Sequence, residues 1–184
     1  MTSFLLVAAS EMGDKTQLLA FSLAARYRRP GPIMAGIFTA TILNHALAAG
    51  VGTWISLHVP ARVMALVLAV TFVAFGLWTL KPDELGEQRG PQRFGPFVTT
   101  TVLFFLAEMA DKTQLATIAL AARYQSVVIV TIGTTLGMLA SNGLAVFLGE
   151  KLAARVQMRW IRVSAASLFF AFGAVSLWGA LRGG

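Results

Sequence analysis

The stretch Glu-Met-Gly-Asp-Lys-Thr-Gln at residues 11–17 returns at residues 108–114 as Glu-Met-Ala-Asp-Lys-Thr-Gln. Each copy lies inside an apolar segment that is long enough to cross a membrane. A charged side chain there costs roughly 2.5–3.5 kcal/mol on insertion scales, so an acid within a membrane segment indicates a functional site. The chain has eight acidic residues, and half of them are in these two copies: Glu11, Asp14, Glu108 and Asp111.

The similarity between the two halves extends well beyond these stretches. Residues 11–27 and 108–124 are identical at 12 of 17 positions, with a constant offset of 97. The same offset pairs Gly36 with Gly133 and Gly76 with Gly173, and no gap is needed. The sequence therefore predicts an internal duplication. We expect one unit at residues 1–80, a hydrophilic cytoplasmic linker at 81–95 and a second unit at 96–184.

The composition is typical of a membrane protein. Of the 184 residues, 57% are hydrophobic and 12% are charged, whereas soluble domains carry about 25% charged residues. The net charge of +7 is attributed to basic loops on the cytoplasmic side, and no nucleic-acid partner is expected. The apolar runs predict an all-α membrane protein with six transmembrane helices, at residues 4–25, 33–57, 62–80, 96–122, 127–148 and 160–181.

The distribution of basic residues predicts the orientation in the bilayer. Outside the two motifs there are 13 basic residues, and ten of them follow the first, third and fifth predicted helices. The positive-inside rule then places both termini outside the cytoplasm, and we expect the bacterial inner membrane. Three helices per unit is an odd number, so the second unit enters the membrane upside down as an inverted-topology repeat. The oligomeric state stays open, with a homodimer among the arrangements considered.

Helical spacing predicts how the motif side chains converge. Residues three apart share one face of a helix, so the Glu and Asp of each copy present two carboxylates to one place. Lys15 and Lys112 follow the Glu of their own copy by four residues, within its reach. If the two helices cross near the midplane, four carboxylates and two ammonium groups leave a charge of −2, which complements one divalent cation or two protons. Neutral oxygens nearby would come from Thr16, Gln17, Thr113 and Gln114.

Oxygen ligands of this kind suit Mg²⁺, Ca²⁺ or Mn²⁺. The chain has no Cys and neither motif contains His, which argues against Cu(I) and makes Zn²⁺ less suitable. Asn44 and His45 align with Ser141 and Asn142 at the same offset of 97. These polar residues either complete the coordination shell or relay protons, or they form plain hydrogen bonds between helices; the sequence does not decide between the functional and the structural role.

The pattern Glu-x-Gly-Asp-(Lys/Arg)-(Thr/Ser), present twice, resembles the Gdt-type cation transporter family, also known as uncharacterised protein family sixteen. The resemblance implies a six-helix membrane protein that exports Mn²⁺, with Ca²⁺ transport and proton antiport in some members. The first copy matches the pattern fully, whereas the second has Ala110 where the pattern has Gly. Because Gly permits a local break, we expect a more regular helix around Ala110.

We therefore expect a secondary active exporter of a divalent cation, Mn²⁺ first and Ca²⁺ second. The ion would be substrate, exchanged for protons by alternating access around a midplane carboxylate site, and no prosthetic group is implied. Burial and mutual repulsion favour protonation of the empty carboxylates, so protons and metal would compete. The alternatives are an exporter of amino acids or other small cations, a passive channel, and an intramembrane metalloenzyme. The duplicated symmetry argues against an enzyme, because catalysis needs one asymmetric centre.

Overall fold

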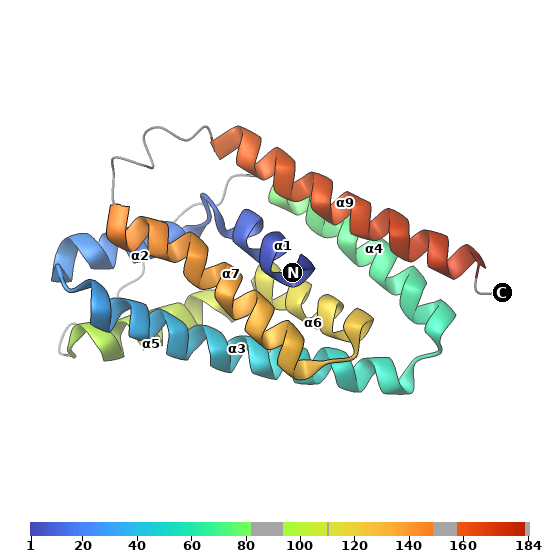
Figure 1. Cartoon of the computed structure of the whole chain (residues 1–184), viewed down its shortest axis with the longest axis horizontal. Coiled ribbons are helices and arrows are strands. Elements are labelled where there is room, and N and C mark those ends of the chain that lie inside the picture. Colours follow the sequence, from blue (N-terminus) through green and yellow to red (C-terminus); the bar gives the residue numbers. More distant parts are fainter. Residues whose placement is uncertain (82–93, 110, 149–157, 183–184) are drawn as a thin grey trace.

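The computed structural model describes residues 1–81, 94–109, 111–148 and 158–182, and within these ranges the regular structure is helical (Figure 1). Most of the predicted linker at 81–95 lies outside the described residues. In chain order the helices are α1 (Thr2–Glu11), α2 (Lys15–Tyr27), α3 (Pro30–His58), α4 (Ala61–Thr79), α5 (Pro96–Glu108), α6 (Lys112–Tyr124), α7 (Val127–Leu148) and α9 (Met158–Arg182).

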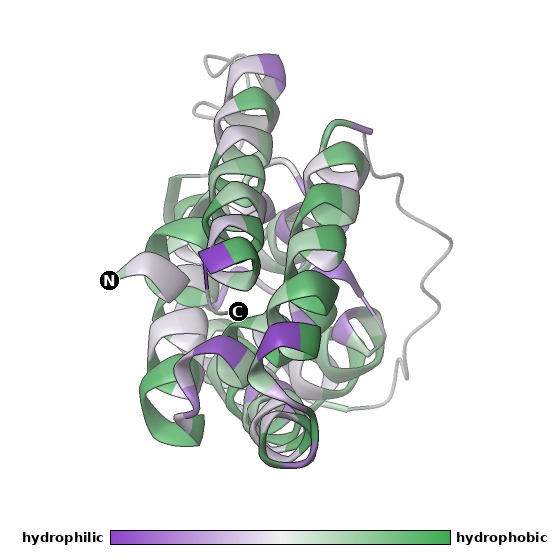
Figure 2. Ribbon diagram, turned by 90° about the vertical axis from the view of Figure 1, so that its right-hand side faces the viewer, coloured by the Kyte–Doolittle hydropathy of each residue, from purple (hydrophilic) through white to green (hydrophobic). Residues whose placement is uncertain are grey.

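Four helices are long and apolar enough to cross a membrane: α3, α4, α7 and residues 163–182 of α9. They agree with the membrane helices predicted at 33–57, 62–80, 127–148 and 160–181. Their mean hydropathy ranges from 1.4 to 2.0, and hydrophobic residues dominate the long helices in Figure 2. The prediction of an all-helical integral membrane protein is therefore confirmed.

The predicted continuous helices at 4–25 and 96–122 are wrong, because each is interrupted in the middle. α1 ends at Glu11 and α2 begins at Lys15. Between them Met12 and Asp14 are extended, with ψ of 118° and 167°, and Gly13 has a φ of 80°. A positive φ cannot be part of a right-handed helix and is adopted readily only by Gly. The first motif is therefore a turn between two short helices.

The second motif has the same interruption, so the expectation of a more regular helix there is also wrong. α5 ends at Glu108 and α6 begins at Lys112. Met109 and Asp111 have ψ of 122° and 166°, within a few degrees of their counterparts in the first copy. Ala110 itself lies outside the described residues. The helix is therefore interrupted in the second copy although that copy has Ala in place of Gly. This indicates that features shared by both copies produce the interruption, including an Asp immediately before the following helix.

Helix α3 runs along α5 and α6, and α7 runs along α1 and α2. Glycines permit these close approaches, which van der Waals packing in a bilayer favours. A Cβ added to Gly36 would lie 2.8 Å from the carbonyl oxygen of Phe97, and one added to Gly52 would lie 2.1 Å from that of Ile118. In the other half, a Cβ on Gly137 would lie 2.7 Å from the carbonyl oxygen of Phe4. The two broken helices are thereby held in the interior.

Helices α4 and α9 form a separate pair beside this bundle and lie side by side in Figure 1. Aromatic side chains fill their contact: the ring of Phe169 lies 6.4 Å from that of Phe72 and 5.9 Å from that of Phe75. Gly173 lets α9 approach the backbone of α4, because its Cβ would lie 3.3 Å from the carbonyl oxygen of Ala69. This pair carries little of the polar chemistry described below.

The duplication extends to contacts between the halves. The hydroxyl of Tyr124, the last residue of α6, forms a hydrogen bond of 2.8 Å with Thr2 in α1. The hydroxyl of Tyr27, the last residue of α2, donates one of 3.2 Å to Thr99 in α5. Both pairs are related by the offset of 97. Each broken helix is therefore tied at its end to the start of the other one.

The glycine contacts of α3 yield a prediction on stability. Gly52→Ala places a methyl group against the backbone of α6 and is expected to destabilise the protein by about 1–3 kcal/mol, as overpacking does. A Cβ added to Gly50 would meet no atom within 4 Å, so Gly50→Ala is the matched control. We expect it to be neutral or slightly stabilising, because Ala favours helix by up to about 1 kcal/mol. Thermal unfolding in detergent compares the two, and equal midpoints would contradict the packing seen here.

Candidate ion-binding site

The two turns place the acidic residues at helix ends. Each Asp is the residue immediately before a helix, α2 or α6, where the positive end of the helix dipole stabilises a carboxylate. In both copies the Asp N–H donates to the carbonyl oxygen of the Glu three residues earlier, at 3.2 Å. The predicted arrangement of Glu and Asp on one face of a continuous helix is thus replaced by a tight turn that brings them to the same region.

Three of the four carboxylates form one compact group. The four acids are almost fully buried, with exposed fractions of 0% for Glu11, 1% for Asp14, 1% for Glu108 and 6% for Asp111. One oxygen from each of Glu11, Glu108 and Asp111 lies within 4.8 Å of the others. We call these three residues the carboxylate group. Asp14 is buried nearby but is not part of it. A spacing of this kind suits a single cation with oxygen ligands.

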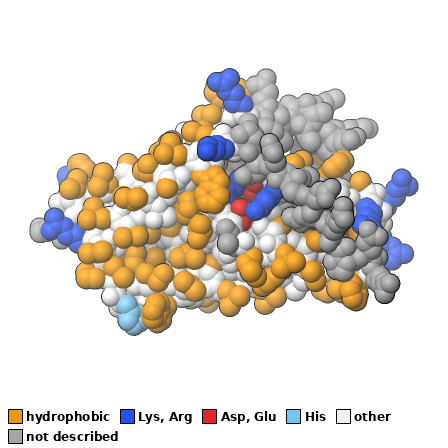
Figure 3. All heavy atoms as spheres, turned by 180° about the vertical axis from the view of Figure 1, so that it is seen from behind, with side chains coloured by type: hydrophobic (Ala, Val, Ile, Leu, Met, Phe, Trp, Pro, Cys, Tyr) orange, Lys and Arg blue, Asp and Glu red, His pale blue; other side chains and the backbone are white. Residues whose placement is uncertain are grey.

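The lysines pair between the two copies. The ammonium of Lys15 lies 2.8 Å from Asp111, and that of Lys112 lies 2.9 Å from Asp14. The sequence predicted reach to the Glu of the same copy, but the turn between Glu and Lys removes the helical spacing on which that prediction rested. Figure 3 shows acidic and basic side chains next to one another, beside a part of the described surface where hydrophobic side chains predominate. The ion pairs therefore join the two broken helices at their interruptions.

The two Glu residues have different surroundings although their sequences match. Thr16 donates to one oxygen of Glu11 at 2.7 Å, and Thr113 donates to the other oxygen. Both threonines that were predicted to supply oxygens near the site therefore donate hydrogen bonds to Glu11. Both oxygens of Glu108 are buried and accept no hydrogen bond from the residues that the structure describes. A buried carboxylate without a donor is costly, so the position of Glu108 favours a bound cation or a proton.

Gln17 stabilises the turn instead of offering its oxygen to the carboxylate group. That oxygen accepts the N–H of Gly13 at 2.7 Å, and its amide nitrogen donates to the carbonyl oxygen of Ser141 at 3.0 Å. The predicted residue Ser141 therefore ties the first motif to α7. Gln114 is partly buried at the equivalent position in α6.

The remaining predicted residues lie on α3 and α7, which pack against the broken helices. Asn44 donates to the carbonyl oxygen of Phe105 at 3.0 Å, a hydrogen bond between helices. Asn142 donates to the carbonyl oxygen of Met138 in its own helix at 3.1 Å. His45 is fully buried, and in the described part of the chain neither ring nitrogen has a hydrogen-bond partner. Asn44 therefore forms a hydrogen bond between helices, which is one of the two roles expected from the sequence. His45 is not a member of the carboxylate group.

The sequence interpretation missed the two Tyr–Thr hydrogen bonds that tie the broken helices together. Tyr27 and Tyr124 end the matching stretches of the two copies, and Thr2 and Thr99 recur at the same offset. That recurrence is the signal that could have found these residues. The pairing itself could not have been found, because the bonds join residues 122 and 72 positions apart in the chain.

A buried carboxylate group between interrupted helices, inside an apolar bundle with membrane-length helices, defines the class of membrane transporters for cations. Comparison with known proteins agrees. A family model described as "Divalent cation/proton antiporter GDT1" matches residues 1–87 and 96–184. The chain belongs to the GDT1 family, as its motifs predicted, and it is a transporter of divalent cations and not an enzyme.

Two relatives match most of the chain. A Vibrio cholerae protein named "Putative manganese exporter" is 44% identical over 164 residues, which are 89% of this chain and 82% of that protein. The GDT1-like protein sll0615 of Synechocystis is 32% identical over 199 residues, which are 95% of this chain and 94% of that protein. No solved structure matches the chain significantly.

The lack of donors to Glu108 yields a prediction on stability. Glu108→Gln removes a buried group that requires a cation or a proton, and is expected to stabilise the metal-free protein by about 1–3 kcal/mol. Glu11→Gln is the matched variant, and we expect it to stabilise less or to destabilise, because its carboxylate already accepts two threonine hydrogen bonds. Thermal unfolding with and without Mn²⁺ measures both effects. A lower midpoint for Glu108→Gln than for Glu11→Gln in metal-free buffer would be inconsistent with an unpartnered Glu108.

Proposed function

We propose that this protein exports Mn²⁺, with Ca²⁺ as the second substrate, in exchange for protons. The observation that carries the proposal is the buried carboxylate group, whose member Glu108 has no donor among the described residues. The ligand atoms are carboxylate oxygens, which suit Mn²⁺ and Ca²⁺. The family description names divalent cations and protons, and the name of the Vibrio cholerae relative names manganese.

Charge balance supports proton exchange. The four acids and two lysines of the motifs sum to −2 when all are ionised. One divalent cation neutralises this charge in the loaded site, and two protons neutralise it in the empty site. Both states then avoid an uncompensated charge in the apolar interior, where such a charge is costly. Release of metal to one side therefore favours uptake of protons from that same side, and the protons are then carried in the opposite direction.

We infer further that each broken helix crosses the membrane as one interrupted span. The pairs α1–α2 and α5–α6 cover residues 2–27 and 96–124, apart from the turns. Neither member of a pair is long enough alone. Together with the four membrane-length helices they make six spans, arranged as two inverted repeats at 1–80 and 96–184, with both termini outside the cytoplasm of the bacterial inner membrane. The contacts repeated at the offset of 97 support this division.

An asymmetry in how α4 and α9 pack supports alternating access. α4 contacts α6 and α9 contacts α1, whereas the counterpart contacts of α9 with α2 and α4 with α5 are at most slight in the described ranges. Because the two units share their sequence pattern, the counterpart arrangement is the one expected for the opposite state. We therefore propose that the α4–α9 pair rocks against the broken helices, opening the site to one side at a time.

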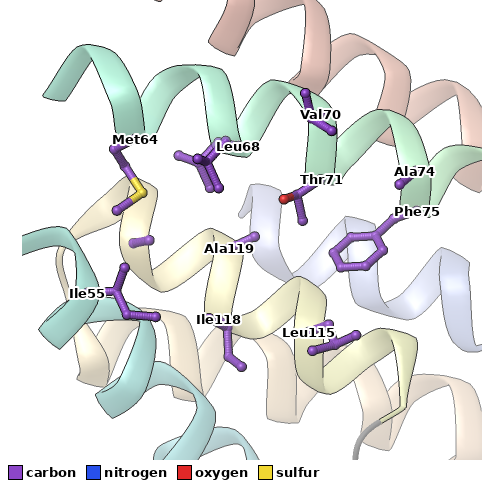
Figure 4. Close-up of a pocket in the computed structure, with 12 residues that line it drawn as sticks. Ile55, Met64, Leu68, Val70, Thr71, Ala74, Phe75, Leu115, Ile118 and Ala119 are labelled. Carbon is purple, nitrogen blue, oxygen red and sulfur yellow. The ribbon is translucent and has the colours of Figure 1, made fainter. Parts of the chain in front are cut away.

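An apolar cleft marks the contact that this motion would change. It has a volume of about 390 Å³ and lies between α4 and α6, with Thr71 and Ala119 facing it from the two helices (Figure 4). A cleft at this contact is consistent with two helices that separate during transport, since side chains that interlock along a whole contact resist relative movement.

The transport proposal is tested with purified protein in liposomes that contain a manganese-sensitive dye. We expect saturable Mn²⁺ flux that an opposing proton gradient accelerates, and a loss of at least about 100-fold in Glu108→Gln and Asp111→Asn. Gly50→Ala, which leaves the site untouched, is the control.

Each other result of the liposome experiment rejects a part of the proposal. Flux that ignores the proton gradient rejects the exchange with protons. Flux that never saturates indicates a channel. Absence of divalent flux from folded wild-type protein, with flux of an amino acid instead, indicates the alternative carrier.

The rocking motion is tested by cross-linking. The chain contains no Cys, so the double variant Thr71→Cys/Ala119→Cys reacts with a bifunctional thiol reagent only across the cleft. We expect the bridge to hold α4 against α6 and to stop Mn²⁺ flux, while each single variant treated in the same way keeps it. A reagent with a cleavable disulfide restores flux after reduction. Unchanged flux in the cross-linked protein would mean that α4 and α6 do not separate during transport.

A further inference from the structure

We propose that Lys15 is a tethered cation that the transported metal displaces from Asp111, and that Lys15 thereby limits the affinity of the site for metal. The proposal rests on the function proposed above and deepens it, because it assigns to one lysine the control of binding and release.

Asp111 has two partners that exclude each other. It belongs to the carboxylate group with Glu11 and Glu108, and one of its oxygens also holds the ammonium of Lys15 at 2.8 Å. Its other oxygen is buried and accepts no hydrogen bond within the described ranges. A divalent cation bound to this carboxylate group would lie close to the Lys15 ammonium. Two positive charges at such a distance in a buried site repel strongly, so metal and ammonium compete for Asp111.

The two ion pairs between the copies differ in accessibility. The side chain of Lys15 is 26% exposed, whereas that of Lys112 is 5% exposed. Lys15 can therefore move its ammonium toward the surface of the protein when it leaves Asp111, away from the charge of the bound ion. The Lys112 side chain is almost fully buried, so separating it from Asp14 would keep its ammonium in the interior, where a charge is costly. Of the two lysines, Lys15 is thus the one suited to move.

Lys15 also acts on the part of the site that lacks donors. Asp111 holds the Lys15 ammonium at 2.8 Å and has an oxygen within 4.8 Å of one from Glu108, so the opposite charges of Lys15 and Glu108 attract across a short distance. In the metal-free site Lys15 therefore supplies part of the positive charge that Glu108 requires. Its four-carbon stem is flexible, so the same side chain can withdraw when the ion enters and return when the ion leaves. When the ion enters and Lys15 withdraws, the buried positive charge therefore rises by one unit instead of two.

The test is equilibrium binding of Mn²⁺ alone to purified protein in detergent. Lys15→Gln removes the competing charge, so we expect Mn²⁺ to bind about tenfold more tightly or better. In liposomes we expect a lower KM for Mn²⁺, because binding is tighter. We also expect a lower maximal rate, because Mn²⁺ is released more slowly. Lys15→Arg keeps the charge and is expected to restore affinity close to that of the wild type. Lys112→Gln is the comparison, and we expect it to give a smaller gain in affinity than Lys15→Gln, because Lys112 pairs with Asp14 and not with a member of the carboxylate group.

A second measurement uses the unaltered protein and covers the case in which Lys15→Gln fails to fold. An amine-reactive reagent followed by peptide mass spectrometry measures the labelling rate of each lysine. We expect Mn²⁺ to raise the labelling of Lys15 severalfold and to leave Lys112 protected. Equal or weaker Mn²⁺ binding by folded Lys15→Gln, or labelling of Lys15 that Mn²⁺ does not raise, overturns the inference while the transport function stands. A wild-type protein that neither binds nor transports Mn²⁺ overturns both.

Discussion

The ion pairs Lys15–Asp111 and Lys112–Asp14 join two interrupted helices inside an apolar bundle. Each pair joins a lysine of one half of the chain to an aspartate of the other half, so in this structure each half depends on the other to neutralise its charges. Placing such charges in an apolar interior is costly, and removing one partner leaves the other buried without compensation. The arrangement therefore depends on both halves being present and correctly oriented, and it fixes the two turns opposite each other.

The turns make this arrangement possible. A continuous helix would satisfy its backbone internally and leave only side chains to meet an ion. The interruptions at residues 12–14 and at 109–111 instead end one helix and begin the next beside the acids. The positive ends of α2 and α6 then lie next to Asp14 and Asp111, where they stabilise negative charge. Close packing at Gly36 and Gly52 holds the second broken helix against α3.

Near-identical sequences produce unequal environments in this structure. Glu11 accepts hydrogen bonds from a threonine of each copy, whereas Glu108 has no donor among the described residues. Lys15 is partly exposed and Lys112 is buried. The packing of the last helix of each unit is also unequal. α4 packs on α6 and α9 packs on α1, whereas contacts of α9 with α2 and of α4 with α5 are at most slight in the described ranges. The alternating carrier proposed above rests on this feature, namely that a duplicated chain adopts one of two equivalent arrangements.

The sequence by itself determined the membrane class, the duplication, the family and the identity of the acidic residues. These follow from composition, from a fixed offset and from the cost of charge in lipid, all of which are local properties. Only the tertiary structure decided that the motif helices are broken, that the lysines pair across copies and that three carboxylates form the group without Asp14. The i,i+3 spacing of Glu and Asp was compatible with a helix and with a turn alike. Partners such as Lys15 and Asp111 are 96 residues apart, so their meeting depends on how the two halves pack and not on any local pattern.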